Sequence, residues 1–198
     1  MMANVSTINM DERCNQIPNC KDESDEMGCK VLVLKEGYNK KVPPVGMAGK
    51  EVKTIRKVSV TTSLILHKVV AIHEEDHSIE FQFQITLEWK ENRASYHNLK
   101  PDSDFNILSE EEIGNLWLPL VIYTNTDQQE TTRLGWINEW STSVRVERRG
   151  NFTRSGSEVL DETEVFKGEE NSLIMTQSYT HEFQCIYQLE RYPFDTQV

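Results

Sequence analysis

Residues 79–89 read IEFQFQITLEW, and this stretch decides the class of fold. Its odd positions are all apolar, whereas its even positions are all polar. Successive side chains of a strand point to opposite faces, so this alternation predicts a strand with one face in a core and the other in water. Strands of that kind are typical of antiparallel sheets.

The segment before this stretch predicts a second strand. Most even positions from Val58 to Ile72 are apolar, and the polar residues HEEDHS at 73–78 then form a turn between the two strands. Further strand-like runs are separated by Gly, Asn and Asp; they read LVIYTNT, STSVRVE, SEVLDETEVFK and LIMTQSYTHEFQCIYQL. Turn signals about every ten residues favour a mainly β protein with a sandwich fold.

One helical signal interrupts the strands, in LSEEEIGNLW at 108–117. Ser109 and Glu112 have the spacing of a capping box, in which each residue hydrogen-bonds the other's backbone. Pro119 follows at once and cannot continue a helix. We therefore expect a short helix near 109–116.

The composition sets the broad class of protein. With 198 residues, of which 37% are hydrophobic and 27% charged, the chain predicts one main globular domain and a small appendage. No apolar run approaches the ~20 residues of a membrane-spanning helix. The net charge of −11 argues against nucleic acid as a partner. The N-terminus lacks an apolar leader although the cysteine pattern indicates an oxidising compartment, so we expect the natural chain to be longer.

The turn segment HEEDH at 73–77 matches the H-E-x-x-H pattern of zinc proteases. That pattern needs a helix, because only then do the two histidines face one metal ion. Here it lies between two alternating strands, so we interpret it as a solvated acidic turn and keep a zinc hydrolase as an alternative. Because the sequence also lacks a G-x-S-x-G elbow and a glycine-rich phosphate loop, we expect no enzyme.

Three of the four cysteines lie near the N-terminus, in CNQIPNCKDESDEMGC at 14–29. This segment resembles the second half of an LDL-receptor class A repeat, with an acidic S-D-E before the last cysteine. The resemblance implies a disulfide between Cys14 and Cys29. The partner of Cys20 would belong to the first half of the repeat.

The same resemblance implies Ca²⁺ ligands, because the carboxylates of such repeats are hard oxygen donors. Asp25 and Glu26 stand at two of those positions, but Asn15 and Asn19 stand where two aspartates are expected. We therefore expect no tight Ca²⁺ site and no other cofactor.

The fourth cysteine begins CIYQLERYPFDTQV at 185–198. This stretch resembles the start of the signature loop of Cys-loop (pentameric ligand-gated) ion channels, in which a cysteine precedes aromatic-Pro-Phe-Asp-x-Gln and a closing cysteine. The closing cysteine would fall one position beyond Val198. The positions that fit are Cys185, Tyr192, Pro193, Phe194, Asp195 and Gln197.

Other segments resemble the extracellular domain of that family in the same order. They are YNKKVPP from residue 38, the hairpin with its acidic turn, WKENRASYHNL from 89, LWLPLVIYTN from 116 and VFKGEENSL from 165. The resemblance implies an immunoglobulin-like β-sandwich, incomplete in this chain. It implies a pentamer of homologous subunits that binds a small neurotransmitter-like ligand, lies on the extracellular side of the plasma membrane and acts on a pore formed by later spans. A soluble secreted binding protein of the same fold is the alternative.

The family's agonist pocket is an aromatic cage, and this sequence departs from it. Gln84 stands five residues before Trp89, at a position that is often aromatic, and Thr124 replaces the usual tyrosine. Tyr123 is adjacent but would lie on the other face of a strand. We expect Trp89 and Trp117 in the core. The candidate ligand-binding residues are Gln84, Tyr123, Thr124, Trp136 and Trp140.

The sequence divides the chain into a leader (1–13), the partial class A module (14–29), a linker with the first family motif (30–57) and the ligand-binding sandwich (58–198). Two Asn-x-Ser/Thr sequons, at Asn4 and Asn151, are typical of glycosylated surface loops in secreted domains.

Overall fold

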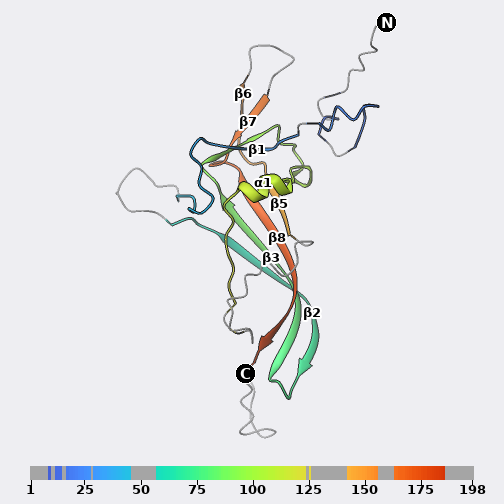
Figure 1. The fold of residues 1–198 in the computed structure, drawn as a ribbon, viewed down its shortest axis with the longest axis vertical. Coiled ribbons are helices and arrows are strands. Elements are labelled where there is room, and N and C mark those ends of the chain that lie inside the picture. The colour runs from blue at the N-terminus through green and yellow to red at the C-terminus, as the bar shows by residue number, and fades with distance from the viewer. Residues whose placement is uncertain are drawn as a thin grey trace. The chain divides into compact units, whose positions relative to one another are not determined.

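The structure is a computed structural model that describes residues 9, 12–14, 17–27, 29–45, 57–123, 125, 142–155 and 163–185. The elements are β1 (Leu32–Leu34), β2 (Thr61–His73), β3 (Ser78–Lys90), β4 (Ala94–His97), the 3₁₀ helix η1 (Ser103–Phe105), α1 (Glu110–Asn115), β5 (Thr142–Glu147), β6 (Phe152–Ser155), β7 (Thr163–Lys167) and β8 (Ser172–Gln184). They form two four-stranded antiparallel sheets, β1-β4-β7-β6 and β2-β3-β8-β5 (Figure 1). The predicted β-sandwich with one short helix is confirmed.

The chain divides into two compact units. Unit 1 comprises residues 1–61, 87–118 and 143–175, and unit 2 comprises 62–86, 119–142 and 176–198. β1 lies in the range that the sequence analysis assigned to the linker, and it pairs with β4 from Leu32↔Tyr96 to Leu34↔Ala94.

The core of unit 1 is built from alternating side chains of strands in both sheets. Their exposed fractions are at most 2%. Full burial of one large apolar side chain contributes roughly 1.5–3 kcal/mol, so this core is the main stabilising feature of the unit. Its residues include Leu87, Trp89, Tyr96, Val144, Val146, Phe166, Leu173 and Met175.

Helix α1 begins at the predicted capping box. The Ser109 hydroxyl accepts from the Glu112 N–H at 3.4 Å, and one Glu112 carboxylate oxygen accepts from the Ser109 N–H at 2.8 Å. The other Glu112 oxygen accepts the N–H groups of Val31 at 2.8 Å and Leu32 at 2.7 Å. Glu112 therefore caps its own helix and also holds the start of β1.

Gly168 shows why the segment after β7 contains a glycine. A Cβ atom there would lie 2.0 Å from the carbonyl oxygen of Glu91 and 2.7 Å from that of Ala94. The Gly168 N–H donates to the Ala94 carbonyl at 3.1 Å. The backbone of the β7–β8 connection thus approaches the β3–β4 connection and the start of β4 too closely for any side chain.

In unit 2, the strand β2 is less buried than the apolar alternation of its sequence suggests. Its apolar side chains are exposed on both faces, at 62% for Leu64, 49% for Ile65 and 60% for Ile72. β2 is an edge strand that pairs with β3. Alternation therefore predicts the strand correctly but does not report how deeply it is buried.

No helix in the described part of the chain is long and apolar enough to cross a bilayer.

Candidate functional site

The H-E-x-x-H segment lies in a hairpin turn. β2 ends at His73, residues 74–77 form the turn, and β3 begins at Ser78. His77 has a φ of 53°, in the left-handed region that occurs in some tight turns and is incompatible with a right-handed α-helix. Within the described residues, no three potential metal ligands gather around one point. The predicted acidic turn is confirmed, and the pattern lacks the helical geometry of a zinc protease.

This turn lies beside the start of the Cys185 segment. The Cys185 N–H donates to the His77 carbonyl at 2.6 Å, and the Ser78 hydroxyl donates to the Glu182 carboxylate. On the same stretch, the Gln184 N–H donates to the Asn125 carbonyl at 2.8 Å. We call these residues the Cys185 junction: His77, Ser78, Asn125, Glu182, Gln184 and Cys185.

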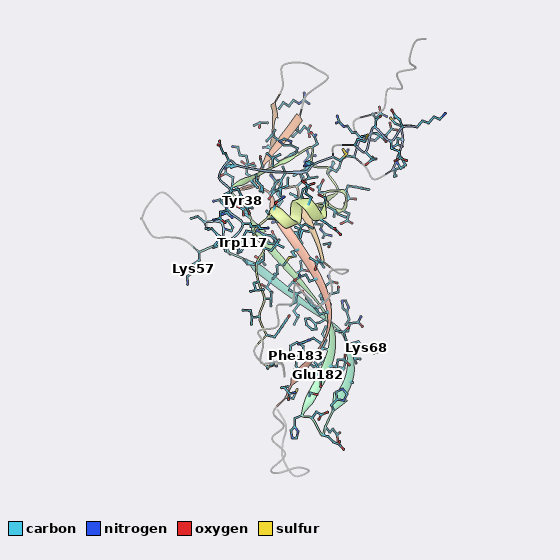
Figure 2. All side chains as sticks on the ribbon, viewed as in Figure 1. Tyr38, Lys57, Lys68, Trp117, Glu182 and Phe183 are labelled. Atoms are coloured by element: carbon cyan, nitrogen blue, oxygen red, sulfur yellow. A yellow bond between two sulfur atoms is a disulfide. The ribbon has the colours of Figure 1, made fainter. Side chains whose placement is uncertain are left out.

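The junction connects three segments of unit 2: the β2–β3 turn, the end of β8 and the segment at 119–125. Figure 2 labels Glu182 and Phe183 at the end of β8. Cys185 is half-buried, and its thiol is free, donating to the Phe183 carbonyl at 3.7 Å. The other coupling-loop candidates, Tyr192, Pro193, Phe194, Asp195 and Gln197, lie outside the described residues.

Sequence reasoning named Cys185 but missed its partners. Ser78 and Glu182 are separated by 104 positions, so no local pattern could pair them. The signal was indirect: the acidic turn and the signature loop were both part of the family resemblance.

An aromatic cluster fills one face of β3 and β8 in unit 2. Tyr123 packs edge-on against Phe83, with ring centroids 5.9 Å apart, and against Phe183 at 5.2 Å. Phe83 also contacts Tyr179 at 5.7 Å, and His181 contacts Phe183 at 5.2 Å. The sequence signal for the cluster was the alternation of aromatic residues at 81 and 83 and at 179, 181 and 183.

The cluster separates two of the candidate ligand-binding residues. Tyr123 lies on the Phe83 face of β3, whereas Gln84, the next residue along the strand, points to the opposite face. The structure therefore does not bring Gln84 and Tyr123 together. Thr124, Trp136 and Trp140 lie outside the described residues.

The polar groups of the cluster are buried. Burial raises the pKa of Tyr123 to about 12 and raises that of Tyr179 as well. Burial lowers the pKa of His181, against the opposing negative charge of Glu182. Among the described residues, the hydroxyls of Tyr123 and Tyr179 and the Nε2 atom of His181 have no hydrogen-bond partner. All three groups are therefore held neutral near pH 7.

A second polar network lies in unit 1, around the fully buried Glu91. Its carboxylate accepts from Arg93 Nε and Nη2, both at 2.7 Å, and from the Tyr38 hydroxyl at 3.1 Å. The Arg93 guanidinium also lies 4.5 Å from the centre of the Tyr38 ring. The Tyr38 hydroxyl in turn accepts the Trp117 N–H at 2.8 Å (Figure 2).

The electrostatics of this network follow from its burial. Desolvation raises the pKa of Tyr38 to about 12, although the Trp117 N–H opposes that shift. The hydrogen bonds from Arg93 to Glu91 raise the pKa of Arg93, which stays charged. Three of the segments that carried the family resemblance, those beginning near residues 38, 89 and 116, therefore meet in one structural network.

Trp89 is 1% exposed and contacts Trp117 edge-on at 6.2 Å. The prediction that it serves the core is confirmed, and half-buried Trp117 packs beside it.

The N-terminal loop is closed by a disulfide between Cys14 and Cys29, the pair that the resemblance to a class A repeat implies. Asp25 is 3% exposed, and its carboxylate accepts the N–H groups of Asn19 at 2.6 Å and Cys20 at 3.2 Å. Desolvation acts to raise the pKa of Asp25, but these hydrogen bonds outweigh it and lower the pKa. Asp25 therefore organises the loop from within.

These features define a class: a two-sheet β-sandwich whose longest strands lead into a hairpin turn and a cysteine-initiated segment. The family model of the neurotransmitter-gated ion-channel ligand binding domain matches residues 30–198. The chain belongs to this family, which is not enzymatic. The matched range begins after the Cys14–Cys29 loop, and a comparison with curated proteins found no match.

Proposed function

We propose that this chain is the extracellular ligand-binding domain of a neurotransmitter-gated channel, in which homologous subunits assemble as a pentamer. A small ligand binds between subunits, and the segment that begins at Cys185 passes the change to a pore in the plasma membrane. Family membership supports the coarse assignment. The Cys185 junction is the observation that supports coupling.

The junction suits this role because its hydrogen bonds join the β2–β3 turn and Asn125 to the end of β8. The Cys185 N–H bond to His77 and the Ser78–Glu182 bond fix the β2–β3 turn to the end of β8. A displacement of β8 by a ligand would therefore move the turn and the Cys185 segment together.

The candidate pocket residues restrict the ligand. Gln84 and Thr124 provide amide and hydroxyl groups where a cation-binding site would use aromatic rings. We propose that Gln84, Thr124, Trp136 and Trp140 border the ligand. Tyr123 packs in the aromatic cluster, on the face of β3 opposite Gln84, and in this proposal it does not contact the ligand.

The function is tested by joining the chain at Val198 to the rest of a family member, from the closing cysteine through the pore. Currents are recorded in oocytes with glycine, γ-aminobutyrate, glutamate, acetylcholine, serotonin and histamine as probes. A current evoked by one probe supports the channel assignment. Binding of a probe without current at normal surface expression favours the soluble binding protein.

We also propose that Cys185 closes a disulfide with the cysteine supplied just after Val198 in that joined protein. Thiol labelling under denaturing conditions should modify Cys185 in the 198-residue chain but not in the joined protein. Equal labelling of both would contradict the signature-loop assignment.

We propose that residues 14–29 are a remnant of an LDL-receptor class A module that does not hold Ca²⁺. The disulfide and the inward role of Asp25 support this assignment. The division into 1–13, 14–29, 30–57 and 58–198 stays a proposal, with β1 added to the sandwich.

A further inference from the structure

The sequon Asn151-Phe152-Thr153 lies at the start of β6. Asn151 and Thr153 are both exposed. Phe152, between them, is half-buried and packs against Phe166 with ring centroids 5.5 Å apart. Side chains two apart in an extended segment share a face, so the exposed side chains of Asn151 and Thr153 lie on the same side of the strand. The Thr153 hydroxyl also donates to the Val165 carbonyl on β7 at 3.5 Å.

The turn before Asn151 is fixed by a buried amide. Asn171 is fully buried, and its Oδ1 atom accepts the N–H groups of Arg149 at 2.9 Å and Gly150 at 3.0 Å. Its Nδ2 atom donates to the Lys167 carbonyl at 2.8 Å. A Cβ atom on Gly150 would lie 2.6 Å from the Glu170 side chain, so the turn packs closely on its neighbour.

The Asn151 side chain itself has no hydrogen-bond partner among the described residues. A fixed turn thus presents the exposed Asn151 amide to solvent.

We propose that Asn151 carries an N-linked glycan. Its Nδ2 atom attacks C1 of the first sugar of a lipid pyrophosphate-linked oligosaccharide. The bond from C1 to the pyrophosphate oxygen breaks, the lipid pyrophosphate leaves with that oxygen, and Nδ2 loses one proton. No oxidant or reductant takes part. The folded structure then keeps the modified side chain in water, where a bulky glycan is tolerated.

The position of the glycan gives it a physical role. β6 is the edge strand of the β1-β4-β7-β6 sheet and pairs with β7 on one side, from Phe152↔Phe166 to Ser155↔Thr163. No strand in the described part of the chain pairs with its other side, so the backbone groups there could pair with another strand. A glycan rooted one residue before β6 covers that edge. It therefore keeps this side of the sheet facing solvent and excludes it from subunit contacts.

This inference rests on the extracellular placement in the proposed function. The full chain, with a cleavable leader fused before Met1, is secreted from cultured insect cells in an Asn4→Gln background that removes the other sequon. Treatment of the secreted protein with peptide N-glycosidase should increase its gel mobility and convert Asn151 to Asp, as read by mass spectrometry.

Matched variants isolate the sequon from the fold. Asn151→Gln and Thr153→Ala should abolish the mobility shift, whereas Thr153→Ser, which keeps an Asn-x-Ser sequon, should retain it. Secreted protein with an unmodified Asn151 would overturn the inference, because secretion shows that the chain passed through the compartment where the oligosaccharide is transferred. That result would leave the channel assignment unchanged.

The edge role has its own measurement, the concentration at which secreted protein self-associates in sedimentation velocity. Enzymatic removal of the glycan from folded protein should lower that concentration, as should Asn151→Gln. If glycosylated and deglycosylated proteins sediment alike at every concentration, the edge role is wrong.

Discussion

Glu91 shows at the scale of one residue how this sandwich tolerates a charge in its core. It is fully buried, and its partners Arg93 and Tyr38 satisfy both carboxylate oxygens. Removing one partner of a buried pair leaves the other charge without compensation, which is more costly than losing an exposed pair.

We expect Arg93→Ala to lower the free energy of unfolding by about 3 kcal/mol, at the lower end for a broken buried pair because the Arg93 side chain is 23% exposed. Lys30→Ala is the control, since it breaks an ion pair with Glu111 whose side chains are 68% and 72% exposed and should cost less than about 1 kcal/mol. Urea unfolding measures both. Equal losses for the two variants would contradict the network.

His181 predicts a pH dependence of stability. Its pKa is lowered in the folded state by burial, so the unfolded chain binds the proton more readily. The stability that neutral His181 contributes is present above the unfolded pKa of about 6.5 and is lost as the pH falls below it. Glu182 is the charged neighbour that opposes the shift. Urea midpoints at pH 7.5 and 5.5 should differ less in His181→Gln than in the wild type, while exposed His67→Gln should leave the difference unchanged.

The Cys14–Cys29 loop should not take up Ca²⁺ at physiological concentration. Both oxygens of Asp25 already accept backbone N–H groups, so its carboxylate is not presented as a ligand. Isothermal titration of the full chain should show no tight binding. Tight uptake that Glu26→Gln weakens would overturn this view.

At the scale of the element, two glycines differ in how closely other atoms approach them. Gly168 lies against the Glu91 and Ala94 carbonyls, whereas a Cβ atom added to Gly114, in α1, would meet no neighbour within 4 Å. We expect Gly168→Ala to destabilise by at least the ~1–3 kcal/mol of an overpacked site. Gly114→Ala should stabilise by about 0.5–1 kcal/mol, because alanine is the better helix former. Thermal unfolding that ranks the two variants in the opposite order would contradict the packing around Gly168.

Local patterns predicted the elements whose causes are local. The alternation from 79 to 89 gave β3, and the Ser109–Glu112 spacing gave the cap of α1. The sequence could not predict how deeply β2 is buried, because its exposure depends on which other elements cover it. The partners of Cys185 were also beyond reach, since the Ser78–Glu182 bond spans 104 positions and arises from tertiary pairing alone.

At the scale of the whole molecule, the family motifs serve two different purposes. Those near residues 38, 89 and 116 meet around Glu91 and stabilise unit 1. The acidic turn and the Cys185 segment meet in unit 2 at the junction that we propose for coupling. The resemblance therefore identified the fold from residues with a structural role. The positions that we propose for ligand binding depart from the family's aromatic cage.

The coupling role of the junction is the central claim, and one measurement tests it most directly. In the joined channel, ligand binding and evoked current are measured separately for Glu182→Gln and for Thr180→Ala, an exposed control on the same strand. We predict that Glu182→Gln leaves the binding constant within about twofold but shifts the half-maximal current concentration about 5–150-fold, the range of typical coupling energies. Thr180→Ala should change neither quantity. A Glu182→Gln channel with wild-type currents would contradict the account.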